Sequence, residues 1–167
     1  MKKALAIFLA FIIGLSMSAQ IQNKLLGFTL GSTTKAEVYE KYKDEGRFRE
    51  NSSEGYSIGN IEFAGHKWDI TSFRFYHDRL LSVQFTLIDL ATPISLMDAS
   101  WDSLSLILLD KYGDYNYYST SEYQIFQDDQ THLALSYTYS GNNKALTLIY
   151  SDRALREQKR QAEEDEL

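Results

Sequence analysis

A Gly-x-Ser-x-Gly pattern at Gly55–Gly59 is the feature of this sequence most similar to catalytic machinery. In serine hydrolases a strand precedes this pattern and a helix follows it, because the sharp turn between them exposes the nucleophile. Here a polar stretch precedes the pattern and strand-forming residues follow it. This context predicts that the match is due to chance and that Ser57 is not a nucleophile.

Histidines and carboxylates are the other candidates for chemistry. A zinc site needs several such side chains to converge, but His66 and His77 fall in predicted turns, and only His132 falls on the polar face of a predicted strand. Paired carboxylates can hydrolyse glycosides when their separation is suitable. We therefore predict no metal and no cofactor, with a small hydrolase that uses His132 or clustered carboxylates as an alternative. The carboxylates considered are Asp69, Asp78, Asp89, Asp128 and Asp129.

Tyrosine is abundant, with 12 residues in the chain, and most of them lie in its second half. Tyrosine is common at binding surfaces because it combines a large contact area with a hydroxyl group and few torsions. We predict a binding surface where tyrosines meet the polar face of the strand that holds His132. The predicted binding residues are His132, Ser136, Thr138, Tyr115, Tyr117 and Tyr118.

The N-terminus has the three parts of a secretory signal peptide. Lys2 and Lys3 precede a twelve-residue apolar run, and the small-residue segment 16–19 follows it. A helix needs about 20 residues to span a bilayer, so the pattern favours cleavage after Ala19 over the alternative of an uncleaved anchor. We predict a periplasmic or secreted protein with no membrane span after removal of residues 1–19. No cysteine is present to carry a lipid anchor.

The remaining composition limits the possible partners. Removal of 19 residues from the 167 leaves 148, with 15 basic and 23 acidic residues and a formal charge of −8. This balance disfavours nucleic acid and anionic membranes as partners, because both attract basic surfaces. Without cysteine, stability must come from packing. The length predicts a single domain over residues 20–151 and a charged tail over 152–167.

Two helices are predicted from capping and periodicity. Thr34 and Glu37 form a capping box, so residues 34–45 should be a helix that ends before Gly46. A second helix should start near Asp98 or Ser100 and end at Gly113. Its predicted apolar stripe consists of Trp101, Leu104, Ile107, Leu108, Leu109 and Tyr112.

Strands are predicted from alternation and from aromatic or β-branched residues. The polar segment 47–55 is predicted to be a loop. Around residue 84, Leu81, Val83, Phe85 and Leu87 should share one face and Ser82, Gln84 and Thr86 the other. Further on, His132, Ser136 and Thr138 should lie opposite Leu133, Leu135, Tyr137 and Tyr139. The other predicted strands are 20–30 (strand or extended), 56–63, 67–76, 115–118, 122–127 and 144–151, with a hairpin turn at 140–143.

The order of these elements predicts an α+β fold. A helix with three strands is followed by a helix with three or four strands, so residues 20–90 and 91–151 form two pattern repeats. We expect one antiparallel sheet with both helices on one face. The mostly charged tail is expected to be a frayed helix or disordered.

Several segments resemble known bacterial envelope proteins. Phe28–Val38 is similar to the start of the helix in the SmpA/OmlA lipoproteins of outer-membrane assembly, although the lipidation cysteine is missing. The tandem pattern resembles the β-lactamase-inhibitor-protein-like (BLIP-like) fold, and segments 62–65, 101–113 and 148–152 are similar to uncharacterised secreted proteins of that architecture. The resemblance implies one concave sheet built from two α/β units, and it carries no catalytic residues across.

Together these observations predict a non-enzymatic binding module that holds a protein or a glycan of the envelope on the concave face of its sheet. Two alternatives remain open, a small extracytoplasmic hydrolase and a structural envelope-assembly factor.

Overall fold

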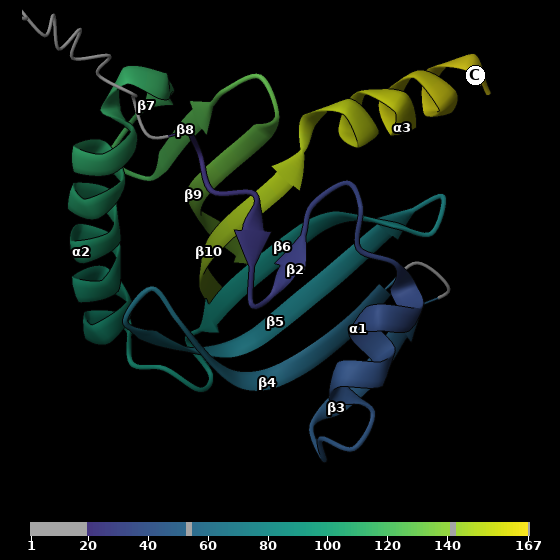
Figure 1. Ribbon diagram of the computed structural model, residues 1–167. Helices are drawn as coiled ribbons and strands as arrows, with labels where there is room; N and C mark the ends of the chain where they lie inside the picture. The colour runs from purple at the N-terminus through teal and green to yellow at the C-terminus, as the bar shows by residue number, and fades with distance from the viewer. Residues whose placement is uncertain (1–19, 53–54, 141–142, 167) are drawn as a thin grey trace, which may run out of the picture.

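The computed structural model describes residues 20–52, 55–140 and 143–166, and it is an α+β fold (Figure 1). The predicted signal peptide and the middle of the predicted 140–143 turn lie outside these residues. The described helices are α1 (Lys35–Tyr42), α2 (Ile94–Tyr112), the short 3-10 helix η1 (Gly113–Tyr115) and α3 (Arg153–Asp165). The described strands are β1 (Lys24–Leu25), β2 (Phe28–Thr29), β3 (Phe48–Ser52), β4 (Gly55–Phe63), β5 (His66–Tyr76), β6 (Arg79–Ile88), β7 (Asn116–Ser119), β8 (Tyr123–Gln127), β9 (Thr131–Ser140) and β10 (Asn143–Asp152).

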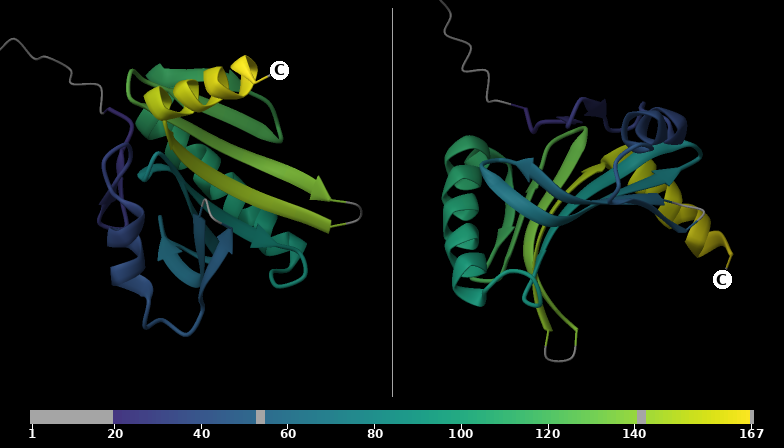
Figure 2. Two further views of the ribbon diagram at one scale, coloured as in Figure 1. Left: turned by 90° about the vertical axis from the view of Figure 1, so that its right-hand side faces the viewer. Right: turned by 90° about the horizontal axis from the view of Figure 1, so that it is seen from below.

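Eight strands form one antiparallel sheet in the order β3-β4-β5-β6-β10-β9-β8-β7, and β1 and β2 form a separate small hairpin. Each run of consecutive strands is a meander, and the last strands of the two runs, β6 and β10, pair at the centre of the sheet. The sheet is strongly curved (Figure 2). α1, α2 and the β1–β2 hairpin lie on its convex side, and α3 lies toward its concave side.

The first helix forms as the capping box predicts. The Thr34 side chain accepts from the amide of Glu37, while a Glu37 carboxylate oxygen accepts from the Thr34 amide at 2.7 Å. Both bonds satisfy backbone donors that the first helical turn leaves unpaired. The prediction of this helix is confirmed, although it ends at Tyr42, a few residues earlier than expected.

The prediction of a loop at 47–55 was wrong, because this segment contains the edge strand β3. β3 pairs with β4 through Phe48 and Ile58, and the Phe48 ring lies 4.9 Å from the ring of Tyr56. An edge strand has a neighbour on one side only. The remaining residues of β3 can therefore be polar.

The predicted start of the second helix was also wrong. α2 begins at Ile94 directly after Pro93, one turn earlier than the expected caps, and no side chain caps it. Asp98 instead accepts hydrogen bonds from the Tyr137 hydroxyl at 2.8 Å and the Lys144 ammonium at 3.1 Å. Two residues of the predicted apolar stripe, Ile107 and Leu109, are exposed, because only one narrow face of α2 touches the sheet.

The charged tail, expected to be a frayed helix or disordered, forms helix α3 over most of its length. Asp152 caps α3 by accepting from the amide of Leu155 at 2.8 Å, and Leu155 is buried. Arg160 pairs with Glu157 and Glu164 along the same helix. Such pairs between residues three or four apart stabilise a polar helix.

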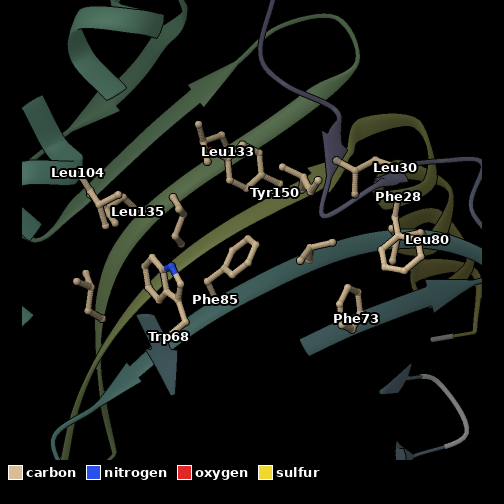
Figure 3. Packing of buried hydrophobic residues seen from close by; sticks show 14 of the residues in the cluster. Phe28, Leu30, Trp68, Phe73, Leu80, Phe85, Leu104, Leu133, Leu135 and Tyr150 are labelled. Carbon is tan, nitrogen blue, oxygen red and sulfur yellow. The ribbon is translucent and has the colours of Figure 1, made fainter. Parts of the chain in front are cut away.

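The core fills the convex side of the sheet, where side chains of α2, the β1–β2 hairpin and the sheet meet (Figure 3). Phe85 is completely buried and stacks on Phe63 with ring centroids 4.2 Å apart. Trp68, also fully buried, donates from Nε1 to the carbonyl of Phe63 at 3.0 Å. Large apolar side chains therefore concentrate on this face.

One predicted side-chain orientation in β6 was wrong. Val83, Phe85 and Leu87 face the core as expected, but Leu81 lines the opposite side together with Ser82. A register shift between β5 and β6 causes this, since Arg74 pairs with Ser82 whereas Phe75 pairs with Leu80. The extra residue on β6 reverses the alternation, as a β-bulge does.

Candidate functional site

The concave face of the sheet carries mostly polar side chains. One row crosses five strands through directly paired residues: Arg74 with Ser82, Ser82 with Ser151, Ser151 with His132, and His132 with Gln127. A parallel row joins Thr86, Thr147, Ser136 and Tyr123. The two rows leave space above the sheet. Side chains as large as those on the convex face would fill this space.

Helix α3 lies over one end of this face and encloses two hollows with it. One has a volume of about 860 Å³ and the other about 330 Å³. Both are lined by Leu81 and His132 from the sheet and by Arg156 and Lys159 from α3. Because the two hollows share these four residues, we call them together the α3 groove.

Cationic side chains line the α3 groove from both sides. Arg74 approaches from β5, and Arg156 and Lys159 approach from α3. Arg153 donates to the carbonyl of Asp128, which joins the start of α3 to the turn before β9. The spacing of three residues from 153 to 156 and from 156 to 159 places these cations on neighbouring positions of one helix face.

His132 is a buried, neutral member of this groove. Its side chain is 8% exposed, and its Nδ1 lies 3.4 Å from the amide oxygen of Gln127. Burial, with smaller contributions from the positive charges of Arg156 and Arg153, lowers the pKa of His132 to about 4. At neutral pH the positive charge of the groove therefore belongs to its arginines and its lysine.

This pKa predicts an acid-sensitive contribution to stability. The folded pKa lies below the ordinary value of 6.5, so below pH 6.5 the unfolded chain takes up a proton that the folded protein resists. The stability that neutral His132 contributes is fully present above pH 6.5 and is lost as the pH falls toward 4. From pH 7 to pH 4.5 we expect the wild type to lose about 1–2 kcal/mol more unfolding free energy than His132→Gln, a value reduced for screening in the open groove.

Urea denaturation of both proteins at the two pH values measures this difference. His77→Gln serves as the control, since His77 is an exposed turn residue. Equal acid sensitivity of the wild type and His132→Gln would contradict the prediction.

The sequence-predicted residues are partly brought together. His132, Ser136 and Thr138 lie on β9 and face the concave side, and the Ser136 hydroxyl is 2.8 Å from that of Thr147. The Tyr118 ring is 6.2 Å from that of Tyr123, at the β8 end of the concave face. Tyr115 packs against the core instead, and Tyr117 is 75% exposed on the edge strand β7.

The residues that sequence reasoning missed are the cations of the groove. Arg74 was hidden among aromatic strand residues, and Arg156 and Lys159 belong to the segment expected to be frayed or disordered. The spacing of the basic residues in 153–160 was the signal available, but it became meaningful only once the helix was placed beside the sheet.

The candidates for catalysis do not assemble. Ser57 lies within strand β4, where its hydroxyl donates to the Asn51 side chain at 2.8 Å, and no helix follows it. Within the described residues no group of three or more His, Cys, Asp or Glu side chains could hold a metal ion. His66 begins β5, and only His77 lies in a turn as predicted.

Comparison of the chain with known protein families, curated proteins and solved structures found no match. Among the helices of residues 20–52, 55–140 and 143–166, none is long and apolar enough to cross a membrane.

Proposed function

We propose that this chain is an exported, non-enzymatic binding protein that holds a partner on the concave face of its sheet. The observation that carries the proposal is the row of polar side chains from Arg74 to Gln127, which α3 overhangs without filling the space. A sheet face that served only for packing would carry large apolar residues, as the convex face of this sheet does.

The shape and chemistry of this face support recognition of a macromolecule of the envelope, protein or glycan. The face combines hydroxyl groups, a guanidinium group and a tyrosine, which together can hydrogen-bond, pair with charge and stack. Clefts that bind ligands usually combine such convergent polar groups with some apolar surface, and Leu81 and Ile149 provide apolar surface here.

We further propose that the two halves of the domain are copies of one α/β unit, as in the BLIP-like fold. The support is the parallel order of elements, in which α1 precedes β3–β6 and α2 precedes β7–β10. Pairing of β6 with β10 would then be the contact between the copies. A role in the envelope rests on the predicted export signal.

Site-specific photo-crosslinking tests the binding proposal. p-Benzoylphenylalanine replaces Tyr123 at the edge of the concave face in one variant and Leu106, which is 70% exposed on α2, in the control. We expect crosslinks to a discrete envelope component from position 123 and none from 106, and Ser136→Arg combined with the first variant should abolish them. Equal labelling from both positions would reject the concave face as the binding surface.

A further inference from the structure

The charge of the α3 groove is opposite to that of the whole chain. The full sequence has a formal charge of −6. Yet the residues around the smaller hollow include three cations, Arg74, Arg156 and Lys159, and no carboxylate. The larger hollow adds two further cations and three carboxylates, so the α3 groove as a whole still has an excess of cations. A local excess of positive charge in a concave site attracts anionic groups and raises their local concentration.

Two of these cations are available to a ligand. The side chains of Arg74 and Arg156 lie on exposed residues and make no ion pair or hydrogen bond with any described residue. The neighbouring Arg160 differs, because Glu157 and Glu164 already neutralise it. A guanidinium group matches a carboxylate with two parallel hydrogen bonds, so the available arginines suit carboxylates particularly well.

The length of the site indicates an extended ligand. From Arg74 on β5 to Tyr123 on β8 the face crosses β6, β10 and β9, which is four strand-to-strand steps. At about 4.8 Å a step the width of the face across these strands is roughly 19 Å. An extended peptide advances about 3.3 Å a residue, so roughly six residues would span the face. A single small anion would occupy only one end of it.

We propose that the α3 groove binds an extended acidic peptide segment of a partner protein. Arg74 and Arg156 pair with its carboxylates, and Tyr123 contacts the end of the segment farthest from Arg74. Hydroxyl groups of Ser82 and Ser151 on the floor are placed to hydrogen-bond with the peptide between these ends. This inference rests on the proposed function and specifies its ligand class.

Fluorescence anisotropy with a labelled hexaglutamate peptide tests the inference on the chain without the predicted signal peptide, residues 1–19. We expect saturable binding that weakens as salt rises, with hexaglutamine bound at least tenfold more weakly. Arg74→Glu and Arg156→Glu should each weaken hexaglutamate binding about tenfold, as expected for loss and reversal of a direct charge pair. Arg47→Glu makes the same charge change outside the groove and should alter the affinity less than about twofold. Thermal melting of each variant checks that it is folded.

Any of five results would overturn the inference. Hexaglutamine could bind as tightly as hexaglutamate, or Arg47→Glu could weaken binding as much as Arg156→Glu, which would indicate only a long-range field. Polygalacturonate could bind more tightly than the peptide, which would assign the groove to an acidic glycan. Lastly, the chain could form a dimer that is lost in Glu163→Lys, a substitution of a residue that lines the larger hollow. That result would assign the groove to a second copy of the chain. If position 123 still crosslinks while hexaglutamate fails to bind, the proposed function stands and only this inference fails.

Discussion

Phe85→Ala is expected to lower the free energy of unfolding by about 3–5 kcal/mol, the usual cost of removing a fully buried aromatic ring. Phe85 is 0% exposed at the centre of β6, where its ring stacks on Phe63 and lies 5.6 Å from the ring of Trp68. Alanine would leave a cavity among rigid rings that cannot collapse into it. Urea denaturation followed by circular dichroism measures the change.

A matched substitution separates burial from residue type. Leu106→Ala removes an apolar side chain from α2 that is 70% exposed, so its effect should remain within about 0.5 kcal/mol. A loss below about 1 kcal/mol for Phe85→Ala would show that the convex-face core does not hold the sheet as described.

Asp128→Ala is expected to cost about 3 kcal/mol, because the buried Asp128 carboxylate serves three backbone donors. It accepts from the amides of Ile21 at 2.7 Å, Gln130 at 2.9 Å and Thr131 at 2.7 Å. Charged hydrogen bonds contribute roughly 1.5–3 kcal/mol each, and unpaired buried donors add a desolvation cost. Asp128→Asn keeps an acceptor oxygen and should lose about half as much.

Denaturation and amide hydrogen exchange together check this prediction. Exchange at Ile21 and Thr131 should accelerate in Asp128→Ala, since the carboxylate ties the N-terminal segment to the turn before β9. The neighbouring Asp129 is exposed, so Asp129→Ala should change stability by less than about 0.5 kcal/mol. Equal effects of the two substitutions would contradict the role given to Asp128.

The parts of the fold that follow from local rules were predictable. Thr34 and Glu37 satisfy each other's backbone groups within one helical turn, so their pattern identifies the start of α1 without tertiary information. The alternation in β9 likewise places His132 and Ser136 opposite Leu133 and Leu135, because successive side chains of a strand point to opposite faces.

The errors occurred where distant residues decide the local structure. β3 is polar and becomes a strand only because β4 offers a free edge to pair with. Asp98 suits a helix cap by its type, but Tyr137 and Lys144, about forty residues away, take its hydrogen-bonding capacity. The bulge at Leu81 depends on the pairing of β6 with β5, which the alternation of one strand cannot reveal.

The candidate site shows the same division. His132, Ser136 and Thr138 were found as a polar strand face, but their groove requires Arg74 from β5 and Arg156 from α3, which lie 82 positions apart in the chain. Asp128 was considered only as one of several candidate carboxylates, and its structural role was not predicted because its contact with Ile21 spans 107 positions.

By itself, therefore, the sequence determined the α+β class, the first helix, most of the strands and the polar face that holds His132. These depend on capping and on alternation, which act between neighbouring residues. Only the tertiary structure decided that the sheet curves, that the charged tail forms a helix beside it, and that cations of an acidic chain gather in the groove between them. Curvature and docking depend on packing between residues far apart in the chain, and no local pattern encodes which of them will meet.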